Sequence, residues 1–173
     1  MSRDARYPIG RFEPPAKYTA AERAQRIAVL AALPDEVRAL VARLQPADLE
    51  RRYRPGGWTV RQVTHHLADS HLNAYLRTKS ILTLPTPTIM GYDQAVWAEL
   101  PDVAAPVEAS LLMLDGLHRR WVVLLRATPG EQFQRQMNHS EHGMMTLDHL
   151  LAMYAWHCYH HASHIRSALK PKA

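Results

Sequence analysis

The stretch LDHLLAMYAWHCYHHASHIRSAL, residues 147–169, decides the fold. Its apolar residues recur at the period of an amphipathic α-helix, and Thr146, immediately before it, is a residue type that caps helix N-termini. Because an α-helix turns by about 100° per residue, these apolar side chains fall in one stripe, roughly 20° to 120° around the axis from His157. A helix with a single apolar stripe buries it against other elements. The stretch therefore predicts one helix of a packed helical domain.

Three other segments show the same period and have recognisable helix starts. Thr19 with Glu22, and Thr59 with Gln62, form capping-box patterns, in which the two residues bond each other's backbone N–H groups. Pro34 should kink or split the first of these helices, because proline has no N–H to donate. The expected bounds of the three segments are residues 19–44, 60–82 and 107–127. Four long amphipathic helices without alternating strand patterns predict an all-α four-helix bundle.

The segments outside these helices contain the proline, glycine and polar residues that are typical of loops. We expect an extended N-terminal arm over residues 1–18, followed by a single bundle domain over residues 19–173. A short extra helix is expected at residues 93–100, in the connection between the second and third long helices. Residues 45–57 and 128–145 are expected to be irregular.

The 173 residues include 47% apolar and 21% charged residues, which is the composition of an ordinary globular domain. At this length, folding buries roughly 70% of the surface of the unfolded chain, so the bundle should fold without a metal. Cys158 is the single cysteine and excludes an intramolecular disulfide. Without a signal peptide or a membrane-spanning apolar run, we expect a cytoplasmic protein with no membrane partner. The net charge of +5 is spread along the chain, which argues against a nucleic-acid partner.

Histidine is the unusual residue type: there are 11, and seven fall in two short windows. On the helical wheel His157 and His161 lie closest to the apolar stripe, about 40° apart. On the second helix His66 is the inward candidate, and His65 points nearly the opposite way. The remaining members of the two windows are His71, His160 and His164.

Residues i and i+4 share a helix face, so the pair His157 and His161 can hold one divalent ion together with a histidine from a facing helix. We therefore expect a metal on His66, His157 and His161. Three protein ligands leave an open coordination position, which is typical of catalytic sites. Imidazole accepts Zn, Ni, Mn and Fe, with Zn or Ni as the leading expectation. The alternative is that these histidines are polar fillers or surface residues.

Several motifs carry a family resemblance that extends over nearly the whole chain. They include YPIG at 7–10, GGWTVRQ at 56–62, HHLADSH at 65–71 and WHCYHHASHI at 156–165. The sequence resembles the DinB-like superfamily, and specifically its YfiT branch of bacillithiol-transferase-like metal-dependent hydrolases. The resemblance implies a four-helix bundle, one divalent metal held by three histidines, and a homodimer. The family's first ligand, the histidine before Leu-Ala-Asp, corresponds to His66, and its last-helix pair corresponds to His157 and His161.

Other residues near the expected site have two interpretations each. Asp69, three residues after the first ligand, could accept an N–H from a ligand imidazole or be a solvated carboxylate. His164 could lie beside the ligands and carry protons, or lie at the surface. Arg61, like Arg54 and Arg77, could hold a carboxylate of a small thiol or be solvated. The four tryptophans are expected to anchor the core.

A metal on neutral imidazoles acidifies the group at its open position, whether a thiol or a water. The expected function is transfer of a low-molecular-weight thiol to an electrophilic substrate, which is a detoxification reaction. Hydrolysis by a metal-activated water is the alternative, but it normally needs a general base, and the two histidine segments contain no paired carboxylates. A non-catalytic metal-binding module is the second alternative. The residues do not specify the thiol, the electrophile or the metal.

Overall fold

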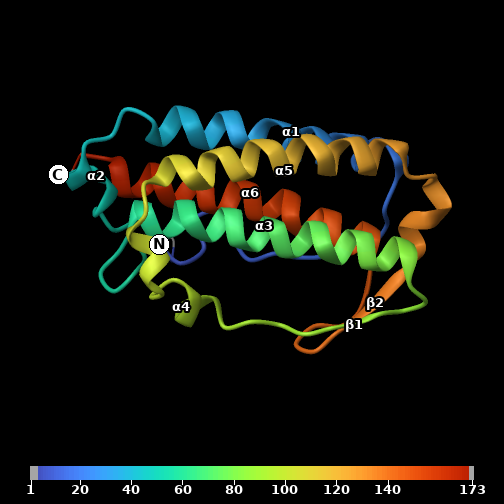
Figure 1. Cartoon of the computed structure of the whole chain (residues 1–173). Helices are drawn as coiled ribbons and strands as arrows, with labels where there is room; N and C mark the ends of the chain where they lie inside the picture. Colours follow the sequence, from blue (N-terminus) through green and yellow to red (C-terminus); the bar gives the residue numbers. More distant parts are fainter. Residues whose placement is uncertain (1–3, 172–173) are drawn as a thin grey trace.

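Four long helices form the body of the structure, a computed structural model that describes residues 4–171 (Figure 1). They are α1 (Ala20–Val41), α3 (Val60–Thr83), α5 (Val107–Ala127) and α6 (Leu147–Leu169). Each packs against two others, so the order around the bundle is α1, α5, α3, α6. The four-helix bundle predicted from the sequence is confirmed.

The connections between the helices give this bundle an uncommon topology. Helices α3 and α5 run in the same direction, opposite to α1 and α6 (Figure 1). Because α1 and α3 lie diagonally across the bundle, the chain between them crosses one end. The chain from α3 to α5, residues 84–106, returns along the length of the bundle because both helices begin at the same end. This return segment forms one wall of the cavity described below.

The three predicted caps are present. Thr19 accepts the backbone N–H of Glu22 in a full capping box, and Thr59 forms the same arrangement with Gln62. The Thr146 side chain caps α6. Helix α1 continues through Pro34 and ends at Val41, three residues before the expected end, so the proposed split is wrong.

A small sheet corrects the expectation of an irregular segment at residues 128–145. Strands β1 (Thr88–Ile89), β2 (Gln136–His139) and β3 (Gly143–Thr146) pair in that order, β1 parallel and β3 antiparallel to β2. A 3₁₀ turn, η2 (Gly130–Gln134), precedes them. Strands of two and four residues are too short for alternation to be visible in the sequence. Gly143, in the left-handed region at φ 68°, follows the turn that joins β2 and β3.

The remaining elements are short. The expected extra helix is present as α4 (Gln94–Trp97), followed by the 3₁₀ turn η1 (Pro101–Ala104). A four-residue helix, α2 (Pro46–Leu49), lies in a segment expected to be irregular. Its first residue is a proline, which suits a helix N-terminus because the missing N–H would have had no partner there.

Residues 4–18 form no helix or strand and lie against α6. The Tyr7 ring is 6.1 Å from the ring of His160, and the Phe12 ring is 5.5 Å from that of His149, as measured between centroids. This agrees with an extended arm. Within residues 4–171, no helix is both long enough and apolar enough to span a membrane.

The apolar core is continuous through the bundle and includes Leu30, Leu33, Leu67, Leu114 and Leu150. Of the four tryptophans, only Trp121 is fully buried in it, at 1% exposure. Trp58 and Trp156 instead contact histidines, and Trp97 is 38% exposed. Trp58 also packs against the core, so the expectation that all four anchor it is wrong for Trp97 and Trp156.

Candidate metal centre

Three imidazoles from α3 and α6 meet inside the bundle. Nitrogen atoms of His66, His157 and His161 all lie within 4.8 Å of one another, and the two Nε2 atoms of His66 and His157 are 3.3 Å apart. A tetrahedral ion with metal–nitrogen bonds of about 2.0–2.1 Å separates two ligand nitrogens by roughly 3.3 Å. The spacing therefore fits one divalent ion, and the structure brings together the three residues expected to bind it.

The surroundings keep these imidazoles neutral. Burial lowers the pKa of His66 to about 4, and burial lowers the pKa values of His157 and His161 well below the usual range. A neutral ring retains the lone pair that a metal needs, so the ligands are ready to bind near pH 7. His66 and His161 are buried, whereas His157 is partly exposed. The site is therefore open on the side of His157.

A second histidine group shares one member with the first. His160, His161 and His164 also have nitrogens within 4.8 Å of one another. The ring of His160 stacks on Trp156 at 4.3 Å, and that of His164 stacks on Tyr53 at 4.0 Å. These aromatic rings cover the group, so it offers no open side comparable to that of His157.

A row of buried histidines runs inward from the site to helix α1. The His157 Nδ1 atom is 3.1 Å from His71 Nε2, and His71 Nδ1 is 3.0 Å from His118 Nε2. The row ends where His118 Nδ1 lies 2.6 Å from the carbonyl oxygen of Leu30. Burial lowers the pKa of His118 to about 4 and that of His71 well below its usual range. All of these rings are therefore neutral near pH 7, with one N–H each.

The Leu30 carbonyl at the end of the row determines which nitrogen of each histidine ring carries the proton. Because a carbonyl can only accept, His118 Nδ1 donates to Leu30, and His118 Nε2 must accept from His71 Nδ1. The same step makes His71 Nε2 the acceptor and His157 Nδ1 the donor. The proton of His157 thus sits on Nδ1 and its lone pair on Nε2, the atom that faces His66. Ligand histidines in metal sites commonly have their other N–H fixed in this way.

The free carbonyl has a simple origin in the sequence. In an α-helix the carbonyl of Leu30 would accept the N–H of residue 34, but that residue is Pro34, which has none. The carbonyl therefore remains available to His118.

Breaking this row should weaken metal binding without removing a ligand. We expect His118→Leu to raise the metal dissociation constant about 10- to 100-fold, the usual effect of losing a group that orients a ligand. His118→Gln should recover much of the affinity, because its amide can donate to Leu30 and accept from His71. Competition with a chromophoric chelator measures the constants.

The control for this prediction is His65→Asn. His65 is buried beside His66, but its ring bonds Ser110 Oγ at 2.7 Å and the Ala105 carbonyl at 3.2 Å, outside the row. Unchanged affinity in His118→Leu, or an equal loss in His65→Asn, contradicts the assignment. These contacts also correct the expectation that His65 points outward: α5 and the segment before it cover the ring.

The other residues named from the sequence lie in different places. Asp69 lines a narrow cleft with His66, and burial raises the pKa of its carboxyl, but no hydrogen bond joins the two side chains in the described structure. His164 Nδ1 is 3.4 Å from His161 Nδ1, so His164 lies directly behind a ligand. Arg61 bonds Glu50 at 2.8 Å and lines a different cavity that contains none of the three histidines.

The Cys158 thiol is buried and its pKa is raised by burial, so it acts as a packing residue.

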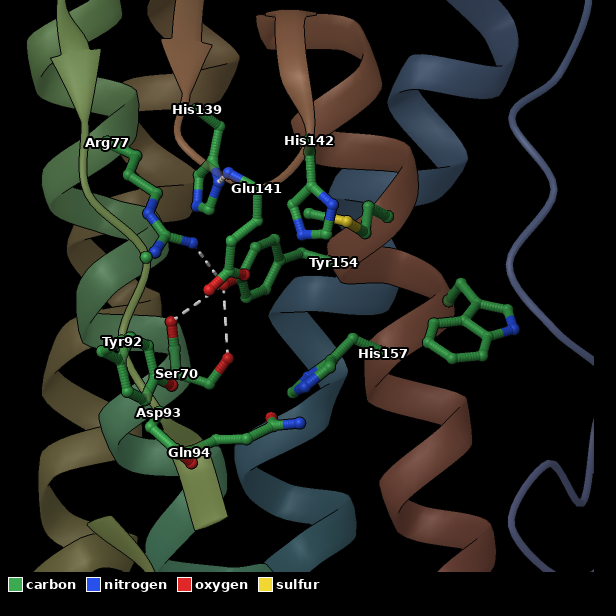
Figure 2. Close-up of a pocket in the computed structure, with 13 residues that line it drawn as sticks. Ser70, Arg77, Tyr92, Asp93, Gln94, His139, Glu141, His142, Tyr154 and His157 are labelled. Atoms are coloured by element: carbon green, nitrogen blue, oxygen red, sulfur yellow. Dashed lines mark hydrogen bonds between the residues drawn. The ribbon is translucent and has the colours of Figure 1, made fainter. Parts of the chain in front are cut away.

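A cavity of about 520 Å³ opens beside His157 (Figure 2). Its floor comes from α3 and α6, and its other walls come from the return segment and from the turn between β2 and β3. The lining residues that sequence reasoning missed include Ser70, Tyr92, Tyr154, His139 at the end of β2, and the turn residues Glu141 and His142. The segment NHSEHG at 138–143 was the available signal, because it places three chemically active side chains in four positions of a polar turn.

The fold and this site define a class of protein: helical bundles that hold a set of metal ligands between facing helices. A family model described as the DinB superfamily matches residues 29–165. The chain belongs to the DinB superfamily, as its motifs implied.

Curated relatives match almost the full chain. A Bacillus cereus (strain B4264) protein named "Putative metal-dependent hydrolase" is 45% identical over 167 residues, which is 96% of each chain. A Bacillus mycoides (strain KBAB4) protein of the same description is 44% identical over 165 residues, which is 95% of each. These names support a metal-dependent enzyme, and they use the word hydrolase and not transferase.

A solved structure has the same fold. YfiT from Bacillus subtilis, described as "a probable metal-dependent hydrolase with an unusual four-helix bundle topology", is 41% identical and superposes with a TM-score of 0.90. The match covers 94% of both chains. The diagonal first connection and the long return segment are thus features of a bundle already observed in a relative.

Proposed function

We propose that this protein is a metal-dependent hydrolase whose substrate enters the cavity beside His157. The observation that carries the proposal is that His157, the partly exposed member of the three-histidine site, and Glu141 line this one cavity (Figure 2). A divalent ion on three imidazoles supplies Lewis-acid chemistry and lowers the pKa of a water at its open position to about 7. The names of the relatives support the same reaction class.

Glu141 supplies the base that the histidine segments lack. It lies on the turn between β2 and β3, about seventy residues from the HHLADSH motif, and reaches into the cavity (Figure 2). In the proposed reaction its carboxylate takes a proton from the attacking water and returns it to the leaving group. A carboxylate that can act as the base for hydrolysis is therefore available in the cavity, although none lies near the histidines in the sequence.

Two phenols can assist in the same cavity. Burial raises the pKa of Tyr92 to about 12 and also raises that of Tyr154, so both keep their protons near pH 7. The Tyr154 hydroxyl donates to the Ser70 carbonyl at 3.1 Å, which holds the ring against α3. Tyr92 can donate a hydrogen bond to the negative oxygen that forms as the scissile carbonyl is attacked.

Thiol transfer to an electrophile is the second candidate. It is favoured by Arg77, a buried cation in this cavity that suits a small thiol carrying carboxylates. The same open position would acidify the thiol in place of water. We propose Zn or Ni as the ion for either reaction, since both accept imidazole ligands.

The test compares water and thiols as nucleophiles on protein reconstituted with zinc or nickel. We expect cleavage of activated esters or amides with water alone, and a loss of about 10²- to 10⁴-fold in kcat for Glu141→Gln. Glu131→Gln, an exposed glutamate on η2, is the control. If the protein instead consumes a thiol and forms its conjugate, without cleaving esters or amides, the hydrolase proposal is wrong and the protein is a thiol transferase.

A further inference from the structure

We propose that the cavity beside His157 binds an oxyanion group of the substrate, a carboxylate or a phosphate, on Arg77 and His139. The inference rests on the proposed function only in taking this cavity as the substrate site. It adds the chemical class of the substrate: a molecule with an anionic end held away from the reacting bond.

Arg77 is a buried cation that forms no ion pair with any residue in the described part of the chain. Its side chain is 7% exposed, and its one hydrogen bond in the described structure is a long one, 3.4 Å from Nη1 to the Tyr154 hydroxyl. The Nε atom is buried without a partner. Among residues 4–171 no carboxylate oxygen lies within 4.0 Å of the guanidinium. Burial of an unpaired charge is costly, so a guanidinium in this state is suited to an anion that arrives with the substrate.

His139 offers a second donor in the same cavity. Its Nδ1 atom accepts the backbone N–H of Glu141 at 3.2 Å, so the proton of the neutral ring lies on Nε2. That Nε2 atom is buried and has no acceptor. Burial and the nearby Arg77 charge both lower the pKa of His139, which keeps the ring neutral. Two unpartnered donors that line one cavity call for a group rich in acceptors.

The tautomer of His139 also argues against a second metal site at the turn between β2 and β3. Side-chain atoms of His139, Glu141 and His142 lie within 4.8 Å of one another and could suggest a second metal site. However, His139 Nδ1 is already an acceptor and Nε2 carries the proton, so neither nitrogen has a free lone pair. An oxyanion therefore fits His139 better than a cation does.

Neither acidic residue that lines the cavity forms an ion pair with Arg77 within 4.0 Å. The Asp93 carboxylate accepts the backbone N–H groups of Ala95 and Val96, at 2.9 and 3.1 Å, and so caps α4. The Glu141 carboxylate lies against Gly91 of the return segment, where a β-carbon would collide with it. The volume of about 520 Å³ leaves room for a small substrate between these groups.

Calorimetric titration of inorganic phosphate and of glutarate, in separate experiments on the full-length zinc-loaded protein, tests the proposal. We expect one of the two anions to bind, which identifies the kind of oxyanion. Arg77→Met should weaken that binding at least about tenfold, the usual effect of losing a charge-assisted hydrogen bond. Because the metal is present in every protein compared, its own affinity for the anion cancels.

The control is Arg61→Met, which removes an arginine that lines another cavity and should leave the binding unchanged. Circular dichroism verifies the fold of each variant. If Arg77→Met does not fold, Arg77→Lys carries the test, since it keeps the charge but loses the planar fork and should bind a few times more weakly. Failure of both anions to bind the wild-type protein, or equal affinity in the Arg77 variants, overturns the proposal.

Ester pairs separate this proposal from the hydrolase proposal. If the protein cleaves esters, it should prefer a 4-nitrophenyl ester with a terminal carboxylate over a neutral one of equal length, and Arg77→Met should remove that preference. An anion that binds through Arg77 in a protein that cleaves no ester or amide supports the subsite and contradicts the hydrolase. Cleavage of both esters at equal rates contradicts the proposed anion subsite but leaves the hydrolase proposal standing.

Discussion

Alanine in place of His66, His157 or His161 removes the bound metal. Each variant loses one of the three nitrogens that lie within 4.8 Å of one another, which leaves only two of the proposed ligands. We expect the metal dissociation constant to rise by more than about a hundredfold, which exceeds the 10- to 100-fold loss typical of groups that only orient a ligand. Elemental analysis after dialysis against a weak chelator measures the metal content.

The matched controls for this prediction lie on the same helix. His160→Ala and His164→Ala each remove a member of the neighbouring group but no proposed ligand, so both should retain the metal. Full metal content in His157→Ala and His161→Ala contradicts the assignment. Loss of metal in the two controls, with retention in the other variants, would move the site one turn along α6.

The metal-free protein should be folded at neutral pH and unfold in mild acid. Burial lowers the folded-state pKa values of His66, His118 and His160 to about 4. Above the unfolded-state value of about 6.5 these groups are neutral in both states and have no effect on stability. Below it the unfolded chain binds protons that the folded chain does not, so the free energy of unfolding falls as the pH falls towards 4.

The expected size of this effect is large. Each such histidine lowers the free energy of unfolding by about 1.4 kcal/mol per pH unit over this range, and a typical domain has only about 5–15 kcal/mol in total. Urea unfolding followed by circular dichroism, at pH 7.5 and at pH 5.5, measures the difference, and His118→Gln should reduce it. Equal urea midpoints at the two pH values contradict the prediction, and a metal-free chain that is unfolded at pH 7.5 shows that the metal is structural.

The helices and the meeting of His66, His157 and His161 could be predicted from the sequence because local rules determine them. The caps at Thr19, Thr59 and Thr146 depend on neighbours within three residues. The i,i+4 relation of His157 and His161 is equally local. His66 required only the knowledge of which face of α3 is apolar. The motif resemblance pointed to the same three residues.

The cavity could not be predicted, because it depends on contacts between distant segments. Glu141 and His139 reach it only because β2 pairs with β1, about fifty residues earlier, and so places the turn beside α3 and α6. Arg77 was considered as an anion-binding residue, but its burial and lack of a partner are properties of the packed structure. The row from His71 to Leu30 likewise needs three helices in contact.

Pro34 shows how a residue that destabilises its own helix can affect a distant side chain. A proline inside a helix is about 3 kcal/mol less favourable than alanine, and sequence reasoning treats it only as a helix breaker. In this protein the N–H that it lacks leaves the Leu30 carbonyl to His118, and through His71 this sets which nitrogen of His157 carries the proton and which faces His66. Helix stability and metal affinity are therefore in opposition at this position. A substitution that strengthens α1 restores a competing donor for the Leu30 carbonyl and weakens the proton arrangement that reaches His157 on α6 through α5 and α3. Selection for thermal stability alone would favour the loss of Pro34, whereas selection for metal retention would preserve it.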